Sequence, residues 1–361
     1  MTSISMPNIW VLGDGQLGAM MKHAGQPLGL NITPVDIMTP SDARLPLGAN
    51  DLITAEREQW PESSLSLQLS QHPHFINGGV FTRLADRYSQ KSLLDDIQVA
   101  TAPWRLVDSN VSNAELFQQL GERVLLKRRT GGYDGKGQHW LNASNNSAIP
   151  NDWRELSIAE QAIAFDEEVS LVGARDANGQ CHFYPLMLNL HQDGILMATL
   201  APLARLKPLQ AKAQAMLSRI MNSLDYVGVM AMECFRLGDD LLVNELAPRV
   251  HNSGHWTQMG CHINQFELHL RALANLAIPE LSIKCQVAMV NLIGVEYDPR
   301  WLSLANTELY WYGKEVRPGR KVGHLNINAT DPERLSETLK TLKLWLPSQY
   351  QAPLTWLDDN K

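Results

Sequence analysis

Residues 232–248 read MECFRLGDDLLVNELAP, in which two apolar segments flank a glycine and two aspartates at 238–240. Three-residue loops are common in β-hairpins, so we predict two antiparallel strands joined by residues 238–240. Side chains directly opposite one another in a hairpin lie on the same face of the sheet. This register pairs Leu237 with Leu241, Phe235 with Val243 and Glu233 with Glu245.

The predicted register brings two carboxylates together, those of Glu233 and Glu245. Like charges with Cβ atoms about 4.5–5.5 Å apart destabilise a sheet. Mg²⁺ would relieve the repulsion, since it takes carboxylate oxygens and usually brings substrate phosphates with it. We therefore predict a magnesium site at this pair. The alternative is that one of the two is protonated or paired with Arg249.

A glycine-rich basic stretch, KRRTGGYDGKGQ at 127–138, combines three adjacent cations with four glycines. Glycine lets the backbone approach a ligand closely, and backbone N–H groups beside Lys or Arg hold phosphate. The stretch favours a phosphate site, although a solvated surface turn has a similar composition. GKEVRPGRKVGH at 313–324 is a second basic turn with the same two interpretations.

The turn GDGQLG at 13–18 fits the G-x-G-x-x-G fingerprint of dinucleotide-binding proteins, and Asp36 follows 18 residues after Gly18. An NAD-dependent oxidoreductase is therefore an alternative. The fingerprint itself requires only an anion at a helix N-terminus, which a substrate phosphate would supply equally well. A tight strand-to-helix turn with no ligand is the third interpretation.

The composition is that of a globular enzyme, with 44% apolar and 19% charged residues in 361. A net charge of −7 argues against general binding to nucleic acid or membrane surfaces. The four cysteines include no C-x-x-C pair, which fits a reducing compartment. No segment is typical of a signal peptide or a membrane span, so we expect a cytoplasmic protein.

The order of strands and helices predicts an α/β segment followed by α+β segments. Apolar strands alternate with helices at the start of the chain, which is typical of a parallel sheet. A proline-bearing connector marks a boundary near residue 100. From about residue 285, several strands and a closing helix suggest a small β-rich domain.

The motifs follow one another as in one enzyme family. GDGQLG, KRRTGGYDGKGQ, EQAI at 160–163, NLHQDGI at 189–195 and NELAPRVHNSGHW at 244–256 closely resemble the 5-(carboxyamino)imidazole ribonucleotide synthetases, ATP-grasp ligases of bacterial purine biosynthesis. The resemblance covers nearly the whole chain. It implies a three-domain ATP-grasp fold: a Rossmann-like pre-ATP-grasp domain at 1–98, an ATP-grasp domain at 99–282 with its lid at about 105–163, and a β-rich C-terminal domain at 283–361.

The resemblance implies a homodimeric ligase that uses ATP and Mg²⁺. It would carboxylate the amine of 5-aminoimidazole ribonucleotide with bicarbonate, through carboxyphosphate. Nucleic acid and membranes are not expected as partners. The alternatives are another ATP-grasp ligase such as the formate-dependent glycinamide ribonucleotide transformylase, the NAD-dependent oxidoreductase, and a non-catalytic nucleotide-binding regulator.

The resemblance also implies roles for individual residues. The catalytic residues would be Arg249, His251, Asp134 and Lys314. The ATP-binding residues would be Arg87, Lys127, Gly132, Tyr133, Asp134, Gly135, Lys136, Gly137, Gln138, the adenine hinge Glu160, Gln161, Ala162 and Ile163, and Glu168, His191, Asn244 and Glu245. The ribonucleotide would contact Gln16, Leu17, Glu56, Tyr133, Lys314, Arg320 and Lys321, and the metal would bind Glu233 and Glu245.

Two positions depart from the family pattern. Lys136 stands where many members have arginine, so a bidentate contact is weakened there. Ala247 stands where many ATP-grasp enzymes have a metal-binding asparagine, so no third protein ligand to the metal is expected.

Overall fold

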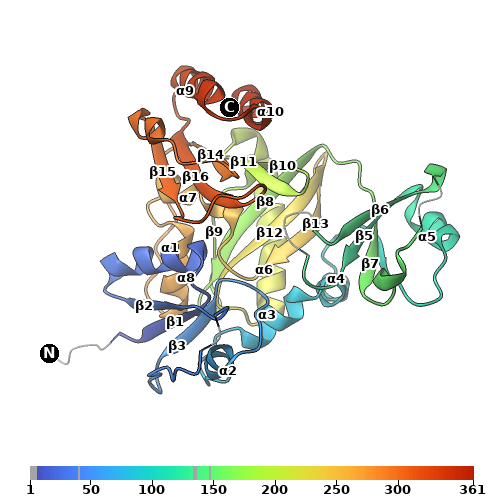
Figure 1. Ribbon diagram of the computed structural model, residues 1–361, viewed down its shortest axis with the longest axis horizontal. Coiled ribbons are helices and arrows are strands. Elements are labelled where there is room, and N and C mark those ends of the chain that lie inside the picture. Colours follow the sequence, from blue (N-terminus) through green and yellow to red (C-terminus); the bar gives the residue numbers. More distant parts are fainter. Residues whose placement is uncertain (1–5, 40, 133–135, 146–147) are drawn as a thin grey trace.

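The computed structural model describes residues 6–39, 41–132, 136–145 and 148–361. The N-terminal segment forms a parallel three-stranded sheet in the order β2-β1-β3, with four helices after its strands (Figure 1). Strand β1 is the central strand of this sheet, and its apolar side chains are buried; Ile9 and Leu12 are fully inaccessible to solvent. The elements are β1 (Asn8–Leu12), α1 (Gln16–Gly25), β2 (Asn31–Val35), β3 (Leu52–Ala55), α2 (Ser64–Ser70), α3 (Gly78–Ala85) and α4 (Arg87–Asp96).

The second sheet has four antiparallel strands in the order β4-β7-β5-β6 and projects to the right in Figure 1. It has a small core of its own, in which Val124 and Leu126 pack with Leu116 and Leu120 of α5. The glycine-rich stretch connects β5 to β6. The elements are β4 (Trp104–Leu106), α5 (Asn113–Leu120), β5 (Arg123–Arg128), β6 (Gln138–Asn142) and β7 (Ser157–Gln161).

The third sheet has nine strands and forms the centre of the molecule. Its path is β13-β12-β8-β10-β11-β14-β16-β15, and β9 pairs with β8. The strands of this sheet are β8 (Glu167–Arg175), β9 (Cys181–Phe183), β10 (Met187–Gln192), β11 (Ile195–Ala201), β12 (Gly228–Leu237), β13 (Asp240–Ala247), β14 (Val287–Ile293), β15 (Thr307–Trp311) and β16 (Lys321–Asn328). The helices in the same part of the chain are α6 (Gln210–Ser223), α7 (Thr257–Gly260), α8 (Gln265–Leu273), α9 (Pro332–Trp345) and α10 (Gln351–Asn360).

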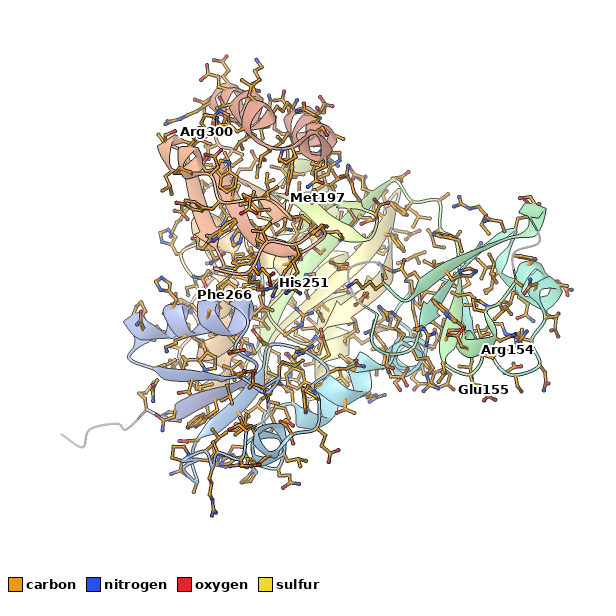
Figure 2. All side chains as sticks on the ribbon, in the orientation of Figure 1. Arg154, Glu155, Met197, His251, Phe266 and Arg300 are labelled. Atoms are coloured by element: carbon orange, nitrogen blue, oxygen red, sulfur yellow. The ribbon has the colours of Figure 1, made fainter. Side chains whose placement is uncertain are left out.

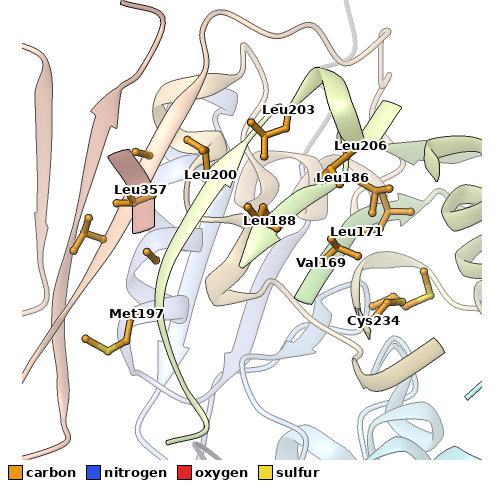
Figure 3. Close-up of a cluster of buried hydrophobic side chains, with 14 of the residues drawn as sticks. Val169, Leu171, Leu186, Leu188, Met197, Leu200, Leu203, Leu206, Cys234 and Leu357 are labelled. Atoms are coloured by element: carbon orange, nitrogen blue, oxygen red, sulfur yellow. The ribbon is translucent and has the colours of Figure 1, made fainter. Parts of the chain in front are cut away.

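The C-terminal strands extend the central sheet. Strand β14 pairs with β11 in antiparallel register, so the β-rich C-terminal segment shares one sheet with the segment before it. One apolar core continues across the junction and joins Leu188 and Leu200 to Leu357 of α10 (Figure 3). Helix α10 is an addition to the single closing helix that the sequence predicted. The mixed α/β architecture itself agrees with the prediction.

Within the described ranges, no helix is both long enough and apolar enough to cross a bilayer.

Candidate active site

The hairpin of β12 and β13 brings Glu233 opposite Glu245, as the sequence predicted. The route to that pairing differs from the prediction, because Leu237 pairs with Asp240 and only residues 238 and 239 form the turn. Gly238 has φ +57°, as the first position of a two-residue hairpin turn often requires.

A β-bulge then restores the predicted opposition of the two carboxylates. The register shifts between Glu233 and Cys234, so that Asn244 is an extra residue on β13. The predicted loop of residues 238–240 was therefore wrong, and so were two of the predicted pairs: Arg236 faces Leu241, and Phe235 faces Leu242.

The Glu233 carboxylate lies in surroundings that disfavour its charge, whereas Glu245 is the more exposed of the pair. The side chain of Glu233 is 18% exposed and that of Glu245 is 48% exposed. Burial raises the pKa of Glu233; His191 opposes this effect and Glu245 adds to it. The Nε2 atoms of His191 and His251 lie 4.0 Å and 3.7 Å from Glu233 Oε1. Glu245 has a cationic neighbour at a similar distance, because Arg87 Nη2 lies 3.6 Å from its Oε2.

Arg249 pairs with neither of the two carboxylates. Its Nε lies 2.8 Å from Glu58 Oε1, on the loop after β3. The predicted alternative, in which Arg249 pairs with Glu233 or Glu245, was therefore wrong. Within the described residues, no group of three or more His, Cys, Asp or Glu side chains is arranged to hold a metal ion. Any ion at Glu233 and Glu245 would need further oxygen ligands from a bound substrate or water.

Two cavities meet beside this pair. The first, here called the lid cavity, has a volume of about 590 Å³ and lies between the four-stranded and nine-stranded sheets. The second, the turn cavity, has a volume of about 610 Å³ and lies beside the 13–18 turn and the 313–321 segment. Figure 2 shows His251 where the N-terminal, central and C-terminal segments converge. Both cavities are lined by Arg87, Glu245, Leu246, Arg249, His251, Asn252 and Lys321.

The predicted site residues divide between the two cavities. The lid cavity is lined by Arg87, Lys127, Gln138, Glu160, Gln161, Ala162, Ile163, Glu168, His191, Glu233, Asn244 and Glu245. The turn cavity is lined by Gln16, Leu17, Glu56, Gly132, Lys314, Arg320 and Lys321. Lys136 and Gly137 line neither of these two cavities. Tyr133, Asp134 and Gly135 lie outside the described residues.

Glu168 and His191 form one wall of the lid cavity. They lie on neighbouring strands β8 and β10, and His191 Nδ1 is hydrogen-bonded to Glu168. Burial lowers the pKa of His191, but the Glu168 hydrogen bond and the charge of Glu233 raise it overall. His251 has the opposite shift, because burial and the nearby charge of Arg249 hold its pKa well below the usual value. His251 is therefore neutral at physiological pH.

Lys127 and Glu160 contact each other inside the lid cavity. Lys127 Nζ lies 2.8 Å from Glu160 Oε2 and donates a hydrogen bond to Asn244 Oδ1 at 2.9 Å. The other carboxylate oxygen of Glu160 lies 3.1 Å from the buried Lys91 Nζ. The Glu160 carboxylate is thus paired with two ammonium groups.

The 13–18 turn is already filled by a carboxylate of the protein. The backbone N–H groups of Gly15 and Gly18 donate to Glu56 Oε1 and Oε2 at 2.6 Å and 2.7 Å. An added Cβ at Gly15 would lie 2.7 Å from Glu56 Oε1, so this glycine is needed for the close approach. The anion that the fingerprint predicts at this helix N-terminus is therefore Glu56. This geometry contradicts the NAD-dependent interpretation.

The sequence did not predict several polar residues of the shared wall and its surroundings. Glu58 orients Arg249, and Lys91 pairs with Glu160. Asn252 has both side-chain amide atoms buried, with no hydrogen-bond partner among the described residues. Buried polar atoms almost always have partners, so such a group beside two cavities is typical of a ligand site. Lys91 had one signal, its position four residues after Arg87 on the same helix.

Known proteins with this arrangement are clearly related. Residues 92–266 match the model of the ATP-grasp domain, and residues 287–338 match that of the phosphoribosylaminoimidazole carboxylase C-terminal domain. The N5-carboxyaminoimidazole ribonucleotide synthase of Escherichia coli K12 is 50% identical over 97% of this chain and 98% of its own.

Solved structures agree with the sequence matches. The N5-carboxyaminoimidazole ribonucleotide synthetase of Thermus thermophilus superposes with a TM-score of 0.80 at 37% identity, over 93% of this chain and 97% of its own. The N5-carboxyaminoimidazole synthase of Aspergillus clavatus, in complex with ADP and 5-aminoimidazole ribonucleotide, superposes with a TM-score of 0.79 at 25% identity, over 99% of both chains.

Proposed function

Because the chain belongs to the N5-carboxyaminoimidazole ribonucleotide synthase family, ATP-dependent ligases of purine biosynthesis with the ATP-grasp fold, we propose that the lid cavity binds ATP and the turn cavity binds 5-aminoimidazole ribonucleotide. The observation that carries this assignment is the wall that the cavities share. Two ligands that exchange a group must meet, and this wall contains the cations Arg87, Arg249 and Lys321.

The proposed reaction has two steps. Bicarbonate attacks the γ-phosphorus of ATP, which yields ADP and carboxyphosphate. The amine of 5-aminoimidazole ribonucleotide then attacks the carboxyl carbon, the C–O bond to phosphate breaks, and the amine loses a proton. Both steps depend mainly on positioning and on stabilisation of negative charge. We assign Arg87 and Lys127 to the phosphates of ATP, and Arg249 with His251 to bicarbonate.

The residues at the shared wall suit these roles. Arg249 is oriented by the pairing of its Nε with Glu58, which leaves other N–H groups of its guanidinium to bind a small planar anion. His251 is neutral, and its Nδ1 accepts a hydrogen bond from the Ser253 backbone N–H, so its Nε2 carries the proton and can donate a hydrogen bond to bicarbonate. Lys314 donates to the side chain of Gln16, which links the basic 313–321 segment to the turn cavity. We propose that Lys314, Arg320 and Lys321 bind the ribonucleotide phosphate.

Mg²⁺ fits Glu233 and Glu245. Their mutual repulsion, the raised pKa of Glu233 and the position of Glu245 in both cavities are consistent with a divalent cation between protein and phosphates. When bound, Mg²⁺ would neutralise charge on the phosphoryl group that is transferred.

ADP release tests the proposed function. It should require bicarbonate and 5-aminoimidazole ribonucleotide together, and the product should contain one carboxyl group on the amine. Equal activity with formate would instead support a transformylase. ADP release without the ribonucleotide, at the full rate, would contradict the assignment of the turn cavity.

We further propose that the enzyme is a cytoplasmic homodimer that acts on small molecules alone. The family resemblance and the acidic net charge of −7 support this proposal. Sedimentation of the purified protein in the presence and absence of duplex DNA would test the dimer and the lack of DNA binding, and fractionation of cells would test the location. A monomeric or DNA-bound species would contradict it.

A further inference from the structure

Lys91, on α4, is a buried cation that the proposed reaction does not use. It is 1% exposed, and its neighbours Glu160 and Lys127 are 3% and 5% exposed. An ammonium group is retained in such surroundings only where it is paired, because burial removes its hydration. Lys91 Nζ lies 3.1 Å from Glu160 Oε1, while Lys127 Nζ lies 2.8 Å from Glu160 Oε2. Two ammonium groups therefore share one carboxylate.

Lys91, Lys127 and Glu160 together carry one surplus positive charge; Asp95 also acts on Lys91, but its effect on the pKa of that lysine is smaller than the effects of Glu160 and Lys127. Lys127 lines the lid cavity, whereas Lys91 lies behind it and lines neither cavity. The surplus charge therefore reaches the cavity through Lys127. With little water nearby, this charge acts strongly on a phosphate. Burial lowers the pKa of Lys91, and it would raise that of Glu160, but Lys127 and Lys91 lower the pKa of Glu160 overall. The carboxylate is thus held in its charged form.

The same lysine connects the lid to the central sheet. Lys91 Nζ donates to Thr101 Oγ1 at 2.5 Å, and Thr101 Oγ1 donates to the carbonyl of Val243 at 2.6 Å. The next residue, Asn244, is the bulge residue that accepts the hydrogen bond from Lys127 at 2.9 Å. The two routes from Lys91 therefore end at adjacent residues of β13.

We propose that Lys91 is a positioning residue for phosphoryl transfer, which holds Glu160 so that the charge of Lys127 remains available to the phosphates of the nucleotide. Without Lys91, Glu160 would pair with Lys127 alone and neutralise it. The inference rests on the proposed binding of ATP in the lid cavity and adds a residue that does not touch the nucleotide.

The test changes the buried charge in single steps. Lys91→Met removes a positive charge and leaves a neutral Lys127–Glu160 pair. Glu160→Gln removes the negative charge and leaves two cations. The double variant removes both and leaves Lys127 as a single cation, which is the wild-type balance. The affinity for ADP should therefore decrease in the order Glu160→Gln, then wild type and the double variant together, then Lys91→Met.

We would measure ADP affinity by titration calorimetry, and KM values by ADP release. Lys91→Met should bind ADP at least about tenfold more weakly, as expected if the charge-assisted contact of Lys127 to the phosphates is lost. The KM for ATP should rise and the KM for the ribonucleotide should change little. Lys212→Met is the matched control, because Lys212 lies on α6 and pairs with Asp240 on the surface. It should behave as wild type.

Recovery of ADP affinity in the double variant separates charge balance from structural damage. A purely structural role for Lys91 predicts that the double variant binds ADP as weakly as Lys91→Met or more weakly, and this result would overturn the inference. Unchanged ADP affinity in Lys91→Met would overturn it as well. If Lys91→Met does not fold, the double variant should still bind ADP more weakly than Glu160→Gln; equal affinity would overturn the inference. If the wild type shows no ribonucleotide-dependent turnover, that result contradicts the proposed function instead. The comparison of ADP affinities among the variants would still test the role of Lys91.

Discussion

Replacement of Glu233 or Glu245 by glutamine should remove activity and leave the metal-free fold as stable as before, or more stable. Glutamine keeps the size and polarity of the side chain and removes its charge. The two residues face each other across the β12–β13 hairpin, and Glu233 is the more buried of the two. Directly opposed like charges destabilise a sheet by about 0.2–1 kcal/mol. The gain should therefore be up to about 1 kcal/mol for Glu233→Gln, or a few degrees in Tm at most. It should be smaller for Glu245→Gln, because that variant also loses the ion pair with Arg87 at 3.6 Å.

The stability difference between Glu233→Gln and wild type should depend on pH. Burial, with a further contribution from Glu245, raises the pKa of Glu233 above its value in the unfolded chain. The folded protein then binds a proton that the unfolded chain has already released, so stability falls as the pH rises through the raised pKa. Glu233→Gln abolishes this contribution. The Tm advantage of the variant should be present at pH 8 and shrink as the pH falls toward the ordinary range of a glutamate.

The assay combines thermal melts without metal and Mg²⁺-dependent ADP release, for both single variants and the double. Turnover should fall strongly in each single variant, because a metal neutralises charge in phosphoryl transfer. The double variant should lose little more than either single variant, since one shared site is disabled. Near-normal turnover in either single variant would refute the metal assignment. If the metal-free Tm of a glutamine variant at pH 8 is several degrees lower than that of wild type, the proposed repulsion between the carboxylates is refuted.

Three further predictions concern the surroundings of the site. Arg320→Ala should raise the KM for the ribonucleotide about 10- to 150-fold and leave the KM for ATP nearly unchanged. Arg320 is chosen because it lines only the turn cavity, whereas Lys321 lines both cavities. Equal effects on both KM values would contradict the phosphate assignment. Glu56→Gln should lower the stability by about 1–3 kcal/mol in thermal melts, because its carboxylate accepts two backbone N–H groups at a helix N-terminus; an unchanged Tm would contradict this anchoring role. Burial raises the pKa of Asp86, but the hydrogen bond and charge of Arg129 lower it overall. The stability that Asp86 contributes is therefore present above its pKa in the unfolded chain and is lost as the pH falls through its pKa in the folded protein. Asp86→Asn should lower the Tm at pH 7, and its Tm should approach that of wild type below about pH 4; a constant difference in Tm at all pH values would contradict this.

Much of the architecture could be predicted because it depends on neighbours in the chain. Apolar strands alternating with helices predicted the parallel N-terminal sheet, and the pattern around Gly238 predicted a hairpin that brings Glu233 opposite Glu245. The predicted opposition was confirmed although the loop length was wrong. A shorter turn and a bulge at Asn244 shift the register by compensating amounts. Periodicity fixes which side chains share a face, but it does not count the residues in a turn.

The contacts that make the site specific could only be known from the tertiary structure. Glu56 fills the anion position at Gly15, 41 residues away in the chain, and Glu58 pairs with Arg249. The pairing of Lys91 with Glu160 requires that α4 pack against the four-stranded sheet. Charge and composition show that carboxylates and cations are present. Which of them meet depends on the packing of separate sheets, because electrostatic partners are chosen by distance in space and by burial, and neither quantity is set by position along the chain.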